Sequence, residues 1–252
     1  MKVFSVFGIS GSGKTTTIER IIAELKKRRY SVGSIKEIHF EKFAIDQEGT
    51  NTDRHKKAGA ELVTARGYYE TDILYPTRLS LEEILKHYYY DYVVVEGIAA
   101  GNFPKIIAAA DVEQIDQRLD DTVFAIAGKI ANQMSEYRGL PVISGIDQAE
   151  KLVDLIEDKV FEQLPDFPKE CCSACGYSCR ELGINILKGR ASREDCVLSS
   201  SRIKLFFDNR EVELVPFVQN LLENVVTGVV RELKGYQPGS SIEVRIGCDE
   251  KR

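Results

Sequence analysis

The sequence lacks a long apolar run, a secretion signal and an excess of basic residues, and each absence excludes a class of protein. A membrane-spanning helix needs roughly 18 consecutive apolar residues, and no run approaches that length. The formal net charge is −5, which argues against a generally nucleic-acid-binding surface. Met1 leads directly into a predicted strand, so we expect a cytoplasmic protein that binds neither membrane nor nucleic acid. Its 252 residues suffice for one large domain or two smaller ones.

Cysteine is absent from the first 170 residues, and all six cysteines follow. Without a secretion signal, such a cluster is more typical of a metal site than of disulfides. The predicted ligands are Cys172, Cys175, Cys179 and Cys196. Four thiolates suit either a structural Zn²⁺ ion or a 4Fe-4S cluster, and three close ligands with one distant ligand favour iron–sulfur. Cys171 could replace Cys172, while Cys248 is left over as a plain thiol.

A phosphate-binding loop is the strongest motif of the chain. It follows the apolar run Val3–Phe7 and precedes a helical stripe of apolar residues, which is the strand–loop–helix context that the motif requires. The predicted nucleotide-binding residues are Gly8, Ser10, Gly11, Ser12, Gly13, Lys14, Thr15 and Thr16. In this pattern backbone N–H groups cradle a polyphosphate, Lys14 reaches its terminal phosphates, and the Thr15 hydroxyl binds Mg²⁺.

An acidic residue at the end of a second buried strand is expected beside this loop. The β-branched run Tyr92–Val95 ends in Glu96, as a central parallel strand with a Walker B carboxylate does. We predict that Glu96 holds a Mg²⁺-bound water or orients the attacking one, and that it shares catalysis with Lys14. Asp46, in the long segment after the second strand, is a further candidate Mg²⁺ contact; the alternative is a solvated loop residue.

Alternating strand and helix patterns predict a doubly wound, mainly parallel α/β sheet over residues 1–165. Strands are expected at Val3–Phe7, Val32–Lys36, Glu61–Arg66, Thr71–Tyr75, Asp91–Gly97, Thr122–Ala127 and Leu140–Ser144. Helices are expected after the phosphate loop, at Asp53–Ala60, at Asp147–Phe161 and from Ser80, where Ser80 and Glu83 form a capping pattern.

A second, small α+β Cys-rich domain is expected over residues 171–252, after a proline-containing boundary at Leu164–Glu170. It should contain a helix from Ser178 to Gly189, a hairpin, a long helix from Pro216 to Gly235 and a final strand. The hairpin strands are expected at Ile203–Phe207 and Glu211–Val215, and the final strand at Ile242–Ile246.

Taken together, several short motifs resemble the MobB family over roughly residues 1–165. Besides the phosphate loop, they are Ile35-Lys36 followed by His39, Asp46 and Gly49, then Arg54-His55 with Ala58-Gly59-Ala60, then Val93–Gly97 with Pro104-Lys105-Ile106. The chain departs from the family pattern at Glu37 and at Thr50-Asn51-Thr52. Separately, Cys172 to Cys196 looks like a short 4Fe-4S-binding domain, although that family generally has one more residue between its second and third cysteines.

The MobB resemblance implies a GTP-binding accessory protein of molybdenum or tungsten cofactor biosynthesis, in the branch that makes molybdopterin guanine dinucleotide. It implies a slow Mg²⁺-dependent GTPase that acts as an adapter, usually as a homodimer, with partners such as a MobA-type guanylyltransferase. Guanine specificity rests on the resemblance alone, because the chain has no Asn-Lys-x-Asp element. Two other classes stay open: a redox protein whose iron–sulfur cluster is gated by nucleotide, and a P-loop small-molecule kinase.

Overall fold

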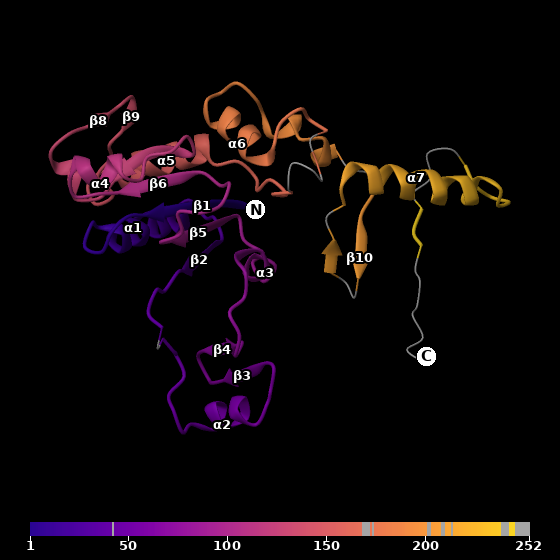
Figure 1. Ribbon diagram of the computed structural model, residues 1–252, viewed down its shortest axis with the longest axis horizontal. Helices are drawn as coiled ribbons and strands as arrows, with labels where there is room; N and C mark the ends of the chain where they lie inside the picture. Colours follow the sequence, from indigo (N-terminus) through magenta and orange to yellow (C-terminus); the bar gives the residue numbers. More distant parts are fainter. Residues whose placement is uncertain are drawn as a thin grey trace. The chain divides into compact units, whose positions relative to one another are not determined.

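The computed structural model describes residues 1–41, 43–167, 172, 174–200, 203–207, 210–212, 214–237 and 242–244 (Figure 1). The chain divides into two compact units, and each is considered separately below. The first comprises Met1–Leu164 with Gly183–Ala191, and the second comprises Pro165–Leu182 with Ser192–Arg252. None of the helices in the described ranges combines the length and hydropathy that crossing a membrane requires.

A five-stranded parallel sheet forms the centre of the first unit, with the strand order β2-β5-β1-β6-β7. The strands are β1 (Lys2–Phe7), β2 (Val32–Lys36), β5 (Tyr92–Glu96), β6 (Lys105–Ala108) and β7 (Val123–Ala127). The three consecutive valines of β5 are almost completely buried. Parallel strands are buried on both faces, which is why β5 is a continuous β-branched run and does not alternate with polar residues.

Helices cover both faces of this sheet, as the doubly wound prediction required. On one face α1 (Lys14–Lys27) and α5 (Ala149–Lys159) pack on Phe4, Val6 and Val94. On the opposite face α3 (Leu81–Leu85) packs near β2 and β5, and α4 (Val112–Asp116) packs near β6 and β7. Successive β1 side chains enter opposite cores because the strand period is two.

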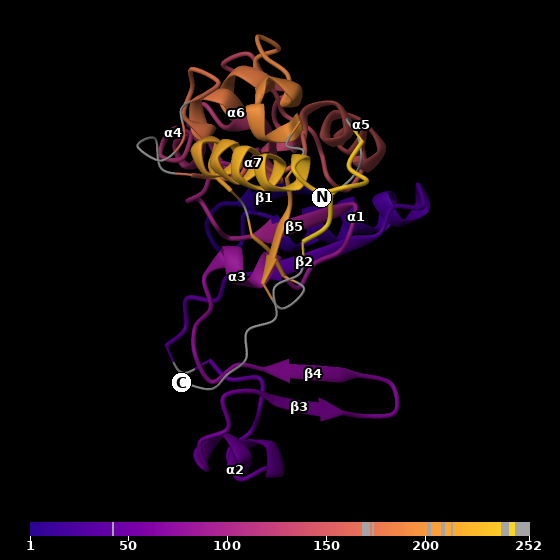
Figure 2. The same cartoon turned by 90° about the vertical axis from the view of Figure 1, so that its right-hand side faces the viewer.

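A separate segment of the first unit projects away from the sheet in both views (Figures 1 and 2). It contains α2 (Asn51–Lys57) and the antiparallel pair β3 (Val63–Arg66) and β4 (Thr71–Leu74). Both strands were predicted, but as part of an alternating strand and helix pattern that implied a parallel sheet. They pair antiparallel with each other as a separate two-stranded sheet, and Tyr68 and Tyr69 are fully exposed at the turn between them.

The sequence patterns failed on the side of the sheet that contains β6 and β7. β6 and α4 were not predicted, because β6 has only four residues, begins with a lysine and has no periodicity to read. The expected strand Leu140–Ser144 is reduced to β9 (Leu140–Pro141), which pairs with β8 (Glu136–Tyr137), plus one parallel bridge between Ile126 and Val142.

The second unit contains short elements and one long helix. β10 (Leu205–Phe207) and β11 (Arg210–Val212) pair in antiparallel register, as the hairpin pattern predicted, while the turn Asp208–Asn209 lies outside the described residues. The long helix is α7 (Pro216–Arg231), with proline in its first turn. Of the expected final strand, residues 242–244 are described without strand structure and the remainder lies outside the described ranges. The helix α6 (Cys179–Leu187) begins in this unit.

Candidate functional site

The loop from Gly8 to Gly13 joins β1 to α1 and packs tightly against the ends of β6 and β7. A Cβ atom on Gly8, whose φ is +155°, would lie 2.0 Å from the carbonyl oxygen of Ala108. Gly13 occupies the N-cap of α1 with a φ of +100°. A Cβ atom on Gly128, after β7, would lie 2.4 Å from the carbonyl oxygen of Ser12. The glycines therefore let three strand ends approach closely and leave the N-terminus of α1 bare for an anion.

Hydroxyl groups hold the loop in shape from the inside. The buried Ser12 side chain donates to the carbonyl oxygen of Ile9 at 2.9 Å, and Thr17 Oγ1 donates to the carbonyl oxygen of Gly13 at 2.9 Å. The Lys129 backbone N–H donates to the carbonyl oxygen of Ser12 at 3.1 Å. The loop conformation is thus fixed by the protein before a nucleotide binds.

Lys14 lies over this loop, near charged groups of both signs. Its Nζ donates to the carbonyl oxygen of Ile9, which puts the ammonium group within the cradle. Partial burial lowers the pKa of Lys14, and the nearby cations Lys36 and Arg118 act in the same direction, while Glu96 opposes them. Three cations beside one loop disfavour each other and together favour a polyanion.

Glu96 lies directly beside Thr15, as the Walker B prediction expects. Thr15 Oγ1 donates to Glu96 Oε1 at 3.1 Å, and Lys36 Nζ contacts the same oxygen at 3.3 Å. The Glu37 N–H donates to the Glu96 carbonyl oxygen at 2.9 Å, so β2 and β5 end together. A hydroxyl and a carboxylate at this distance are oxygen donors of the kind that Mg²⁺ prefers, so the residues present fit this ion.

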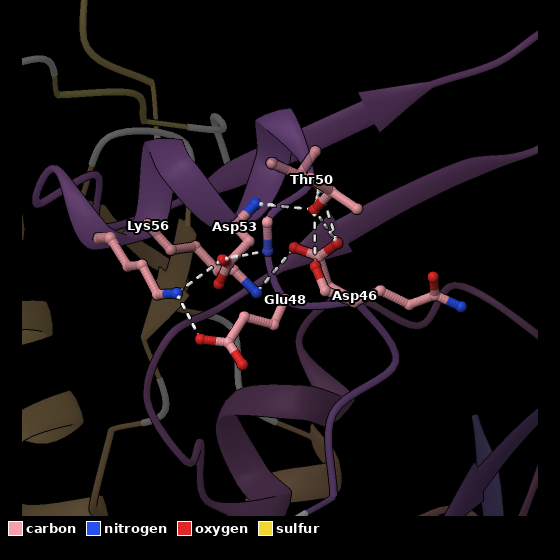
Figure 3. A network of polar contacts seen from close by, with 9 residues as sticks. Asp46, Glu48, Thr50, Asp53 and Lys56 are labelled. Carbon is pink, nitrogen blue, oxygen red and sulfur yellow. Dashed lines mark hydrogen bonds and ion pairs between the residues drawn. The ribbon is translucent and has the colours of Figure 1, made fainter.

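Asp46 belongs to a different cluster, at the N-terminus of α2 (Figure 3). Its Oδ1 accepts from Thr50 Oγ1 at 2.8 Å and from Thr52 Oγ1 at 2.9 Å, and Lys56 Nζ lies 2.8 Å from its Oδ2. Lys56 and the two hydroxyls lower the pKa of Asp46 to about 2. Thr50 also caps α2 by accepting from the Asp53 N–H. This network fixes the loop before α2, and its contacts do not include Thr15 or Glu96.

The predicted loop residues, Glu96 and the helix start are therefore brought together, whereas Asp46 lies in its own network. Sequence reasoning missed Lys36, Arg118 and Gly128 as parts of the site. For Lys36 a signal existed, since it ends the strand predicted at Val32–Lys36, and parallel strands end at one edge. Arg118 and Gly128 had no such signal, because the strand before Arg118 was not recognised and the packing of Gly128 against Ser12 is a long-range contact.

The predicted four-thiolate site is not supported by the structure. All four predicted ligands are free thiols, of which Cys179 and Cys196 are buried and Cys172 and Cys175 are partly exposed. Among the residues that the structure describes, no three Cys, His, Asp or Glu side chains converge as a metal site. Burial raises the pKa of the Cys179 thiol, which is the behaviour of a packed small hydrophobe. The spacing placed the cysteines near one another in sequence but did not fix the directions of their side chains. Cys171 and Cys248 lie outside the described ranges.

Comparisons with known proteins agree with this description of the first unit. A family model described as "Molybdopterin guanine dinucleotide synthesis protein B" matches residues 3–129. A putative molybdopterin-guanine dinucleotide biosynthesis adapter protein of Methanocaldococcus jannaschii is 30% identical over 98% of this chain and 97% of its own length. A probable adapter protein of the same description from Bacillus subtilis is 28% identical over 58% of this chain and 86% of its own.

Solved structures show the same fold. The crystal structure of Bacillus subtilis MobB superposes with a TM-score of 0.53 at 23% sequence identity, covering 65% of this chain and 100% of that one. The α/β parallel-sheet fold is therefore common to both proteins. On the family model and the full-length relative together, this chain belongs to the MobB family.

Proposed function

We propose that this protein is a GTP-binding accessory protein in the biosynthesis of molybdopterin guanine dinucleotide. The observation that carries the proposal is the pre-formed loop from Gly8 to Thr16, with Glu96 at 3.1 Å from Thr15. The names of its relatives, which describe adapters in that pathway, supply the biological setting.

In this proposal the loop residues bind and orient the triphosphate. The triphosphate charge is neutralised by backbone N–H groups at the start of α1 and by the Lys14 ammonium group. These groups are already in place when negative charge develops on the oxygens of the phosphoryl group that is transferred. Thr15 and Glu96 would hold Mg²⁺, which when bound supplies further neutralisation of the phosphates. Glu96, held by Lys36 and Thr15, accepts a hydrogen bond from a water and so orients it. The expected result is a slow GTPase activity that serves the adapter role.

A titration with GTP and ATP tests this proposal. With Mg²⁺ present, the full-length protein should bind GTP and not ATP, and Lys14→Ala should weaken GTP binding by about tenfold or more, since a charge-assisted contact contributes about 1.5–3 kcal/mol. Lys26→Ala is the matched control, because Lys26 is exposed at the far end of the same helix and makes the same change in charge. Preference for ATP, or equal loss in both variants, would contradict the proposal.

The partners belong to the same proposal. An adapter needs a client, and a MobA-type guanylyltransferase is the client that the resemblance implies, with the chain itself acting as a homodimer in the cytoplasm. Sedimentation velocity of the purified protein should show a dimer, and addition of the guanylyltransferase with GTP should produce a heavier species. The adapter role would be contradicted if the protein sedimented as a monomer and did not bind the guanylyltransferase with GTP, with GDP or without nucleotide.

The thiols of the second unit stay a separate prediction. Anaerobic purification followed by metal analysis and a visible spectrum decides among three outcomes: iron with sulfide, zinc, or neither. No step of the proposed activity depends on the result. A cluster whose reduction potential shifts when nucleotide binds would favour the redox alternative over the adapter.

A further inference from the structure

A cavity distinct from the phosphate loop lies at the edge of the sheet where β2 and β5 end. Its volume is about 640 Å³, within the range of about 300–1,000 Å³ that small-molecule sites occupy. It is lined by side chains of β2, by the segment before α3 and the start of α3 itself, and by the loop after β5. Ligands of open α/β sheets bind off this carboxyl edge, so the cavity occupies a place where a ligand is expected.

The cavity lies beside the end of β5, on the face of the sheet that α3 covers. Gly97 and Ile98, which line it, directly follow Glu96, and Glu37 donates its N–H to the Glu96 carbonyl oxygen. The hydroxyl of buried Ser5 holds the carbonyl oxygen of Ile98 at 2.6 Å and so fixes this wall to β1. The Glu96 side chain contacts Thr15 at the start of α1, and α1 covers the opposite face of the sheet. A molecule in the cavity would therefore occupy a site separate from the phosphate loop, and the segment Glu96–Ile98 would connect the two sites.

The walls combine aliphatic surfaces with a few charged groups. Ile35, Leu79, Leu81, Ile84 and Ile98 supply apolar area. The polar groups are Glu37, His39, Arg78 and Ser80. Arg78 NH2 lies 2.6 Å from Glu37 Oε1, while the Arg78 side chain is 85% exposed and that of Glu37 is 24% exposed. An ion pair that is open to water on its cationic side is weak, so a ligand can replace Arg78 at low cost.

We propose that this cavity binds a fused ring system carrying a 2-amino-4-oxopyrimidine edge and an anionic tail. The guanidinium of Arg78 has N–H donors on two nitrogens that are bonded to one carbon, and these face the carboxylate of Glu37. A 2-amino-4-oxopyrimidine has the same arrangement in its amino group and ring N–H, so it can donate to the same carboxylate. The flat ring then lies between the aliphatic walls. Arg78, released from Glu37, is free to bind the phosphate of the tail.

Two molecules share this ring chemistry, a phosphorylated pterin and a guanine nucleotide. The assignment rests on the proposed function, because a pathway that joins a pterin to a guanine nucleotide contains both. It deepens that function by naming a second ligand, which binds at a site separate from the phosphate loop.

Calorimetry on the full-length protein tests the proposal. The phosphate loop is first saturated with a non-hydrolysable GTP analogue and Mg²⁺, and neopterin monophosphate or GMP is then titrated. One equivalent of at least one of them should bind, and the tighter one identifies the source of the ring. IMP, which lacks only the 2-amino group of GMP, should bind at least tenfold more weakly than GMP if GMP is the ligand. For neopterin monophosphate the comparator is a lumazine phosphate, which lacks the same amino group.

Two substitutions separate the ring contact from the tail contact. Glu37→Gln keeps the size of the side chain but replaces an acceptor with a donor, and should weaken binding about ten- to hundredfold. Glu41→Gln, at an exposed position that does not line the cavity, is the matched control and should bind normally. Arg78→Gln should weaken neopterin monophosphate several-fold and should not weaken unphosphorylated neopterin, because the same substitution frees Glu37 from its ion pair.

The proposal is overturned if neither molecule binds while the analogue occupies the loop, if the comparators bind as tightly, or if Glu37→Gln behaves like Glu41→Gln. These failures are distinct from failure of the proposed function. Loss of GTP specificity at the phosphate loop, with ring binding that still depends on Glu37, would remove the GTP assignment and keep the cavity. Normal GTP binding at the phosphate loop, with no ring compound bound in the cavity, would keep the GTP assignment and remove the cavity proposal.

Discussion

Gly8 shows how strictly a single position can be constrained by packing. An alanine there would place its Cβ atom 2.0 Å from the Ala108 carbonyl oxygen, at a backbone φ of +155°. Gly11 also has a positive φ, +75°, but a Cβ atom there would meet no atom within 4 Å beyond its own chain neighbours. Gly8→Ala should therefore destabilise the protein by about 1–3 kcal/mol and abolish nucleotide binding. Gly11→Ala should cost only the strain of a left-handed alanine, about 1 kcal/mol.

Urea denaturation and GTP titration of both variants measure this difference. Equal stability of the two variants would show that the loop does not pack against β6 as described. The comparison isolates the close contact because backbone strain is present in both.

Asp46 makes a second prediction at the residue scale, on pH. Its pKa is lowered to about 2 by Lys56 and the threonine hydroxyls, from a usual value near 3.8. A depressed carboxyl pKa stabilises the folded state above the unfolded pKa, and the contribution disappears as pH falls through the folded pKa. Asp46→Asn should therefore be less stable than wild type at pH 7, and the gap should close between about pH 4 and pH 2.

The difference in stability between wild type and Asp46→Asn can be measured by hydrogen exchange of the α2 amides or by thermal unfolding across this pH range. Glu48→Gln is the control, because Glu48 is 90% exposed and pairs only at the surface with Lys57. A constant gap from pH 7 to pH 2 would mean that the network of Figure 3 does not lower the pKa of Asp46.

The residue scale also shows what sequence could supply about the site. The phosphate loop was predictable because its motif is local in sequence. Glu96 was predictable because it ends a β-branched run that is typical of a buried parallel strand. Lys36 ends a predicted strand and so carried a signal, whereas Arg118 joins the site through β6 and the strand order β2-β5-β1-β6-β7, which no local pattern encodes. Asp46 carries the right chemistry for Mg²⁺, yet its partners Thr50, Thr52 and Lys56 engage both of its oxygens.

At the scale of elements, the predictions held where a segment was long or carried a cap. The pattern at Ser80 is a capping box in the structure, with both reciprocal hydrogen bonds between Ser80 and Glu83. β1, α1 and β5 were equally clear. β6 was missed because four residues are too few for periodicity, and the β3–β4 pair was placed in the wrong kind of sheet because pairing partners are set by tertiary packing.

Ser5 links two of these elements and makes a third prediction. Its buried hydroxyl lies 2.6 Å from the carbonyl oxygen of Ile98 and 3.2 Å from that of Val95, so β1 holds the loop that follows β5. Ser5→Ala leaves the Ile98 carbonyl oxygen without this donor and should destabilise the protein by about 1–3 kcal/mol. It should also weaken ligand binding in the cavity, since Ile98 forms part of its wall.

Ser34→Ala serves as the comparison, because the Ser34 side chain is exposed on β2, which lies on the other side of β5 from β1. Chemical denaturation should separate the two variants clearly. If Ser5→Ala unfolds at the same urea concentration as Ser34→Ala, the hydrogen bond to Ile98 does not hold the loop.

At the scale of the whole molecule, an acidic protein carries a basic site. The formal net charge is −5, so GTP is repelled at long range, and binding depends on the local field of Lys14, Lys36 and Arg118. Arg118 lies on the segment after α4, and its NH1 donates to the carbonyl oxygen of Gln114. It contributes to the site through charge, since it disfavours the protonated form of Lys14 and favours phosphate.

Arg118→Gln should therefore weaken GTP binding about two- to tenfold and make that binding less sensitive to salt, because one cation of the local field is removed. Arg20→Gln makes the same change in net charge on the exposed surface of α1, and should leave GTP affinity nearly unchanged. Titrations at about 50 and 300 mM salt give both the affinity and its slope. Equal weakening by the two substitutions would mean that net charge, and not the placement of Arg118, governs the attraction of GTP. A larger effect of Arg118→Gln, confined to low salt, would establish the local field as the reason an acidic protein binds a polyanion.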